Sequence, residues 1–139
     1  MALSFDINYI AVLASAIAGM VLGALWYGPL FGKRWIKLME RSEKDIKKAK
    51  QKSMAKSYVG AFAGTLVFAY VLAIMIVNLG AATLAEGFVV AFLLWLGFIA
   101  TSMLNSVIWE GKPVEIYTIG IGHYLVVFLA MSAILVFWA

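Results

Sequence analysis

Four long apolar stretches constrain the fold of this chain more than any other feature of its sequence. They cover residues 8–30, 57–79, 85–109 and 114–138 and leave little of the 139-residue chain outside them. A helix rises about 1.5 Å per residue, so roughly 20 apolar residues cross a hydrocarbon layer of about 30 Å. Because 65% of the residues are hydrophobic and 13% are charged, a single soluble core could not bury them. We therefore predict an all-α fold, an integral membrane four-helix transmembrane bundle that forms one domain over residues 1–139.

Charge is concentrated in the segment between the first and second apolar stretches, residues 33–56. This segment holds ten of the eleven basic residues and three of the seven acidic residues, which leaves it with a net charge of +7. Basic loops stay in the cytoplasm according to the positive-inside rule. We therefore predict a multi-pass protein of the cell (plasma) membrane, with loop 33–56 in the cytoplasm and the N- and C-termini outside. The uncharged loop at residues 80–83 and the basic Lys112 in the last loop fit this orientation.

The basic loop is also expected to contact anionic lipid headgroups, which attract basic residues close to a membrane surface. The residues that we assign to this role are Lys33, Arg34, Lys37, Lys47 and Lys48. Nucleic-acid binding is the less favoured interpretation, because no aromatic residue that would stack on a base lies between Ile36 and Ser57. We predict membrane lipids as partners of the loop, and no nucleic acid.

Small residues spaced four apart indicate where helices approach one another closely in a membrane. The first stretch carries Ser15, Gly19 and Gly23 on one face, and the second carries Gly60 and Gly64. We expect these faces to pack against other helices, either within one subunit or across an interface between subunits. Because a bundle of this size has few internal contacts, we also expect a homo-oligomer.

Polar residues within the apolar stretches predict a pocket in the cytoplasmic half, because an unpaired polar group in hydrocarbon is costly. In the third stretch, Thr101, Ser102 and Asn105 share one helical face. The only histidine, His123, lies about 13 Å along the fourth helix if that helix starts at residue 114. This places it at a depth similar to that of Thr101 and Ser102. The candidate pocket between the four helices comprises Trp26, Tyr27, Thr101, Ser102, Asn105 and His123.

Two interpretations of His123 stay open. A neutral imidazole can hydrogen-bond to a serine or threonine of a neighbouring helix, or it can act as a proton relay or a substrate contact. Asn105 likewise acts either as a clamp between helices or as a ligand contact. A single histidine without cysteines or nearby carboxylates is a poor metal site, so we expect no metal and no cofactor. We assign no catalytic residue and do not expect an enzyme, because the sequence has no nucleophile arrangement and no phosphate-binding loop.

A distinctive aromatic motif closes the first apolar stretch. Residues 23–35 read Gly-Ala-Leu-Trp-Tyr-Gly-Pro-Leu-Phe-Gly-Lys-Arg-Trp, and residues 109–113 read Trp-Glu-Gly-Lys-Pro shortly after Asn105. These segments resemble the signature of a bacterial and archaeal membrane family known as domain of unknown function 1761, and the resemblance extends over nearly the whole chain. It implies a four-helix membrane protein with a charged loop after its first helix and without an established activity.

Two roles are open for the side chains of this motif. Pro29 lacks a backbone donor, so the helix is expected to end where Trp26 and Tyr27 anchor in the headgroup layer. Alternatively, these two side chains turn inward and line the same pocket as Asn105. In that arrangement Glu110, in the last loop, is expected to pair with Lys33, Arg34 or Lys112.

Two classes of function fit this sequence. The first is binding or passage of a small solute or ion through the cytoplasmic-half pocket, as in a transporter or channel. The third stretch turns apolar above Thr101, however, and the first stretch lacks the carboxylate on which small multidrug exporters rely. The alternative is a structural membrane protein that assembles through its glycine-rich helix faces and binds lipid or a protein partner with its basic loop.

Overall fold

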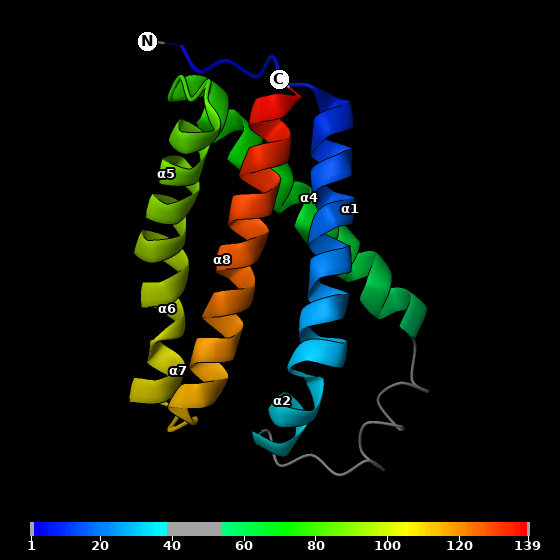
Figure 1. The fold of residues 1–139 in the computed structure, drawn as a ribbon, viewed down its shortest axis with the longest axis vertical. Helices are drawn as coiled ribbons and strands as arrows, with labels where there is room; N and C mark the ends of the chain where they lie inside the picture. Colours follow the sequence, from blue (N-terminus) through cyan, green and yellow to red (C-terminus); the bar gives the residue numbers. More distant parts are fainter. Residues whose placement is uncertain (1, 39–53, 139) are drawn as a thin grey trace.

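The computed structural model describes residues 2–38 and 54–138, and they form long helices joined by short connections (Figure 1). The first span consists of α1 (Tyr9–Leu25) and the π-helical segment η1 (Trp26–Leu30), and the short helix α2 (Gly32–Leu38) follows it. The second span is α4 (Met54–Asn78). The third consists of α5 (Leu84–Leu94), the π-helical segment η2 (Trp95–Ala100), α6 (Thr101–Met103) and α7 (Asn105–Ile108). The fourth is α8 (Val114–Phe137).

Each of the four spans is long and apolar enough to cross a membrane. Their bounds are Tyr9–Leu30, Ala55–Asn78, Leu84–Ile108 and Val114–Phe137. All of these ends lie within two residues of the ends predicted from hydropathy. No strand occurs among the described residues. The predicted fold class, an all-α bundle of four transmembrane helices, is confirmed, and the molecule is a multi-pass membrane protein.

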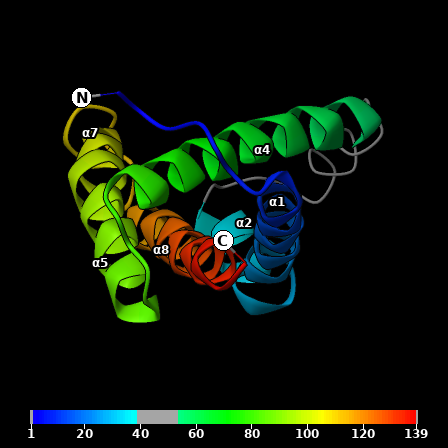
Figure 2. The ribbon, with the colours of Figure 1, turned by 90° about the horizontal axis from the view of Figure 1, so that it is seen from above.

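Helix α8 is the central element of the bundle. It packs against α1 on one side and against α5 and η2 on the other. The three spans run side by side, and α4 crosses them obliquely (Figure 1). Seen from above, α4 lies across one face of this layer (Figure 2). Two spans, α1 and the α5–α7 span, are therefore separated by α8 over most of their length.

The buried core lies near the terminal end of the bundle, which is the end that holds the N- and C-termini (Figure 1). Ala16, Ala69 and Met131 are completely buried there. In α4 the buried residues all lie between positions 69 and 76, whereas residues 55–61 are exposed. Helix α4 therefore diverges from α1 and α8 toward the opposite end of the bundle. We call that end the loop end, because η1, α2 and the turn between α7 and α8 lie there.

The glycine face of α1 packs inside the subunit. Ser15 and Gly19 are buried, and a Cβ placed at Gly19 would meet the Cε of Met131 at 2.6 Å and the Cγ2 of Thr65 at 3.0 Å. The absence of a side chain at Gly19 therefore lets α1 approach both α8 and α4 closely. The glycine face of α4 differs, because Cβ atoms at Gly60 and Gly64 would meet no atom of the described residues within 4 Å.

Hydrogen bonds from two asparagines hold the terminal end together. The Asn8 side chain accepts from the N–H groups of Ile10 and Ala11, which caps α1, and donates to the carbonyl of Trp138 at 2.7 Å. Asn78 accepts from the N–H of Ser4 and donates back to the Ser4 carbonyl. The extended N-terminal segment is thereby fixed across the ends of α4 and α8.

Candidate ligand-binding pocket

The π-helical turn at the end of the first span has its physical cause in Pro29. Proline has no N–H, and in an α-helix its ring clashes with the carbonyl four residues earlier. A wider π-helical turn relieves that crowding, and here the N–H of Phe31 donates to the carbonyl of Trp26 at 2.8 Å. The chain then turns back so tightly that a Cβ at Gly32 would lie 2.5 Å from the carbonyl oxygen of Tyr27. The helix therefore continues through η1 and redirects into α2 instead of stopping at the proline.

The aromatic side chains of η1 face α8. The indole N–H of Trp26 donates to the carbonyl oxygen of Ile119 at 2.9 Å, and a Cβ at Gly122 would lie 3.1 Å from the Trp26 ring. Tyr27 is half-buried and packs edge-to-face on His123, with ring centroids 5.1 Å apart. Both side chains therefore have the inward orientation, one of the two that the sequence left open.

His123 is surrounded by aromatic rings. Besides Tyr27, the rings of Tyr124 and Trp26 lie 5.0 Å and 6.4 Å from it. Its two ring nitrogens are buried and have no hydrogen-bond partner among the described residues. The Nε2 atom lies 3.3 Å from the position that a Cβ at Gly23 would occupy. The glycine thus makes room for the imidazole next to α1.

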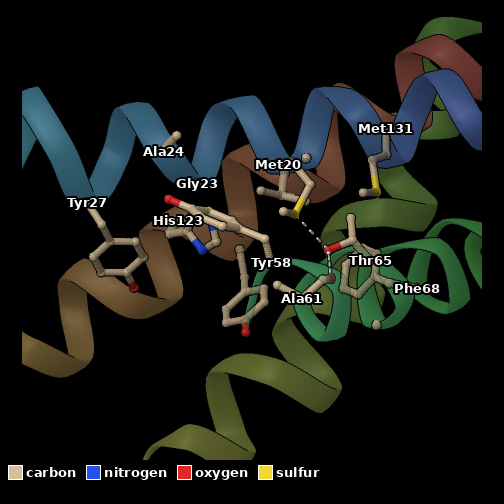
Figure 3. A pocket seen from close by; sticks show the side chains of 14 residues that line it. Met20, Gly23, Ala24, Tyr27, Tyr58, Ala61, Thr65, Phe68, His123 and Met131 are labelled. Atoms are coloured by element: carbon tan, nitrogen blue, oxygen red, sulfur yellow. Dashed lines mark hydrogen bonds between the residues drawn. The ribbon is translucent and has the colours of Figure 1, made fainter. Parts of the chain in front are cut away.

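A cavity of about 610 Å³ lies between α1, α4 and α8 at the level of His123 (Figure 3). Divergence of α4 from the other two helices creates it. We call it the His123 pocket and define it by its lining residues: Gly19, Met20, Gly23, Ala24, Tyr27, Tyr58, Ala61, Gly64, Thr65, Phe68, His123, Tyr124, Val127 and Met131. Most of this surface is apolar or aromatic, and none of the described residues that line it carries a formal charge. Its polar groups are the imidazole, three tyrosine hydroxyls and the hydroxyl of Thr65, which donates to the Ala61 carbonyl at 2.7 Å.

Of the six candidate pocket residues, the structure brings three together. Trp26, Tyr27 and His123 are neighbours, with Tyr27 and His123 lining the pocket and Trp26 packed on their far side. The residues of the third span that were expected to complete this pocket, Thr101, Ser102 and Asn105, are exposed and absent from its lining. Their hydrogen bonds stay within their own span, from Thr101 Oγ1 to the Gly97 carbonyl and from Asn105 Nδ2 to the Ser102 carbonyl.

The physical reason for this difference is rotation about the helix axis. Depth differs as well, because hydrogen bonds join Trp95 to Ile121 and Tyr117 to Ala100, so that Thr101 lies nearer the start of α8 than His123 does. The π-helical segment η2 adds a wide turn just before Thr101, which changes the phase of the residues that follow. In addition, α8 lies between the third span and α1 (Figure 2). The polar face of the third span therefore does not reach the pocket.

Several residues that line the His123 pocket were not predicted from the sequence. On α4 these are Tyr58, Ala61, Thr65 and Phe68. Their spacing of three, four and three residues is the period of one helical face, so the signal was present in the sequence. It was hidden because an aromatic residue in a membrane span is usually in contact with lipid or with the core, and neither Tyr58 nor Phe68 stands out from the surrounding apolar residues.

Ion pairs lie at the loop end, and one of them joins α2 to α8. Arg34 on α2 donates to both carboxylate oxygens of Glu115 on α8, at 2.5 Å and 2.6 Å. This hydrogen bonding raises the pKa of the Arg34 guanidinium above its ordinary value. Glu110 pairs with Lys112 at 3.2 Å, which is one of its three predicted partners.

The remaining basic residues assigned to lipid headgroups fall into two groups. Lys33 and Lys37 are exposed on α2, at the loop end of the bundle. Lys47 and Lys48 lie outside the described residues. In the part of the chain that the structure describes, no three His, Cys, Asp or Glu side chains come close enough to hold a metal ion.

Together, the four spans and the His123 pocket between α1, α4 and α8 define a small multi-pass membrane protein with an uncharged, aromatic cavity. The chain belongs to the family described as protein of unknown function (DUF1761), whose sequence profile matches residues 10–136. The family resemblance of the aromatic motif is thereby confirmed. No curated protein and no solved structure matches this chain.

Proposed function

We propose that the His123 pocket binds a small, uncharged molecule that contains a flat ring and a hydrogen-bonding carbonyl or hydroxyl group. The observation that carries this proposal is that both His123 nitrogens are buried without a protein partner among the described residues. A neutral imidazole has one donor and one acceptor, and leaving such groups unpaired costs about 1–3 kcal/mol each. Both nitrogens are covered in this conformation, so a ligand that displaces a covering ring and hydrogen-bonds to His123 removes that cost.

The remaining lining supports an aromatic ligand without a charge. Tyr27, Tyr58, Phe68 and Tyr124 offer ring faces and edges, and offset or edge-to-face contacts between rings are favourable. Within residues 2–38 and 54–138, no carboxylate or basic side chain lines the pocket, and burying an unpaired charge at this depth is costly. A cavity of about 610 Å³ also has the size of a typical small-molecule site. These features favour an uncharged ring compound over an ion.

The geometry favours binding over passage through a single subunit. Between the pocket and the terminal end, the interior is filled by side chains such as Ala16, Ala69 and Met131, which are completely buried. A solute would have to part this core to cross. The pocket is instead bordered by the diverging half of α4, so we propose that its ligand enters between α4 and α1 from the loop end or from the bilayer.

We further propose that the loop end faces the cytoplasm of a cell whose plasma membrane the protein spans. The support is the charge distribution, since ten of the eleven basic residues lie in segment 33–56 and such segments stay on the cytoplasmic side. Lys33 and Lys37 are exposed at this end, and we expect them to contact anionic headgroups. Both termini then lie outside.

Assembly into a homo-oligomer is a second candidate function, favoured by one specific observation. Gly60 and Gly64 of α4 are exposed, and side chains at these positions would meet no described atom within 4 Å. A face of small residues that is not used within the subunit permits close approach of a second membrane helix. This face adjoins the proposed binding site, because Gly64 also lines the His123 pocket whereas Gly60 does not.

Binding of menadione, an uncharged naphthoquinone, tests the proposed site. The chain has no cysteine with which a quinone could react. In lipid nanodiscs, we expect menadione to bind saturably to the wild-type protein and about tenfold or more weakly to His123→Leu, a loss of at least about 1.4 kcal/mol. Asn105→Leu is the matched control, because it also removes a polar side chain from a span but lies outside the pocket. Equal weakening by both substitutions, or no saturable binding at all, would refute the proposal.

A further inference from the structure

A second cavity of about 340 Å³ lies farther along the same face of α4, between α4, the α5–η2 span and α8. We call it the Phe98 cavity. Its lining consists of apolar side chains only: Phe68, Val71, Leu72, Met75, Leu94, Phe98, Ile99 and Phe128. None of the described side chains that line it is charged or able to form hydrogen bonds, so its surface suits a hydrocarbon chain.

The Phe68 side chain is shared by the two cavities. It lines the His123 pocket and the Phe98 cavity. Its ring packs edge-to-face on Phe128 at a centroid distance of 4.4 Å and lies 6.5 Å from the ring of Tyr124. Phe68 is half-buried, and it lies ten residues, about 15 Å, beyond Tyr58 along α4. Phe68 therefore forms part of the boundary between the two spaces, which lie next to each other along one face of α4.

We infer that the ligand of the His123 pocket is an amphiphile whose hydrocarbon chain passes Phe68 and occupies the Phe98 cavity. This inference rests on the proposed function and names the class of its ligand: an uncharged quinone or phenol ring that carries an alkyl or isoprenoid chain. The ring lies among the tyrosines and hydrogen-bonds to His123. The chain lies in the apolar cavity, which opens toward the bilayer beside the exposed side chains of Val71 and Phe98.

The order of the two cavities argues for this ligand over an ordinary phospholipid. A phospholipid headgroup is charged and stays near the membrane surface, whereas the polar end of the site is an uncharged pocket within the spans. Binding of a phospholipid chain in the Phe98 cavity alone would not depend on His123, because that chain would make no contact with the imidazole. If His123→Leu weakens binding of the chain, the occupant is the ring-bearing amphiphile; if it does not, the occupant is a phospholipid chain.

Two probes with the same head test the inference: menadione, and menadione that carries a decyl chain ending in a photoreactive diazirine. Affinities are measured in nanodiscs as a function of mole fraction in the bilayer, so that partitioning is not counted as binding. On illumination, we expect the chain end to label residues that line the Phe98 cavity, with labelling lost in His123→Leu. Labelling spread over lipid-facing residues, or unchanged in His123→Leu, would overturn the inference.

Filling the cavity gives an independent test. Val71→Trp places a large side chain in the lining, and Val67→Trp places the same side chain one turn away at an exposed position that lines neither cavity. We expect Val71→Trp to weaken binding of the chain-bearing probe about fivefold or more and to leave menadione binding unchanged. Val67→Trp should change neither.

The outcomes distinguish this inference from the proposed function. If menadione binds through His123 but Val71→Trp weakens the chain-bearing probe no more than Val67→Trp does, the chain inference is wrong and the pocket proposal stands. If neither probe binds saturably to the wild-type protein, both are wrong.

Discussion

The indole nitrogen of Trp26 donates a hydrogen bond of 2.9 Å to the backbone carbonyl of Ile119. On the opposite side of α8, Trp95 makes the equivalent bond of 2.7 Å to the carbonyl of Ile121. Both tryptophans begin a π-helical segment, η1 or η2. The central helix is thus held from both sides at the level just before His123, which fixes one wall of the His123 pocket.

Trp26→Phe tests the first of these bonds. Phenylalanine keeps an aromatic ring but cannot donate, so we expect a loss of about 0.5–1.5 kcal/mol of unfolding free energy and a lower thermal midpoint in detergent. Trp109→Phe is the control, because Trp109 is 81% exposed and makes no side-chain hydrogen bond within the described residues. Equal midpoints for the two variants would contradict the structural role of Trp26.

Gly32→Ala tests the tight turn between η1 and α2. A Cβ at this position would lie 2.5 Å from the Tyr27 carbonyl oxygen, and a backbone atom cannot move aside as a side chain can. We expect a destabilisation of about 1–3 kcal/mol, as for other overpacked positions, measured by thermal unfolding. Gly28→Ala, four residues earlier, would meet no described atom within 4 Å and should have little effect. The turn is described wrongly if Gly28→Ala is the more harmful change.

A charge exchange tests the pair between Arg34 and Glu115, which joins α2 to α8. We expect Arg34→Glu and Glu115→Arg each to lower the thermal midpoint, because each places two like charges at the pair. The double exchange should recover most of the loss. The effect should shrink at high salt, since both groups are exposed. Additive losses in the double variant would show that the two residues do not interact.

Gly60→Leu tests assembly through α4. Gly60 lies outside the lining of the His123 pocket, so its substitution should leave menadione binding intact. If copies of the chain pack through this face, native mass spectrometry should show an oligomer for the wild-type protein and smaller species for Gly60→Leu. The control, Gly97→Leu, also adds a side chain in open space but on the third span. A wild-type monomer in native lipid would exclude this assembly.

Hydropathy predicted the four spans well, because the length and apolar character of a membrane helix are properties of consecutive residues. Leu30 was predicted as the end of the first span and is its end in the structure. The crossing of α4 could not be predicted in this way. Its angle depends on which side chains fit against α1 and α8, for example Thr65 and Met131 around Gly19, and these contacts join residues far apart in the sequence.

Only part of the candidate site was predicted from the sequence. The aromatic motif at the end of the first span is distinctive, and the chain has a single histidine. Trp26, Tyr27 and His123 could therefore be chosen from the sequence as candidates. Asn105 was also chosen as a candidate, because it is a polar residue within a span. The direction of its side chain depends on the π-helical segment η2, and η2 contains no proline from which it could have been predicted. The tyrosine and threonine of α4 that line the pocket were recognisable by their spacing only once their partner helices were known.

A high-resolution density map of the protein with menadione in lipid nanodiscs tests the central claim most directly. We predict ring-shaped density between α1, α4 and α8, with one oxygen within hydrogen-bonding distance of a His123 nitrogen and the ring beside Tyr27 and Tyr124. The claim would be contradicted by a map in which α4 closes against α8 and fills the His123 pocket with protein side chains, or in which menadione lies only elsewhere.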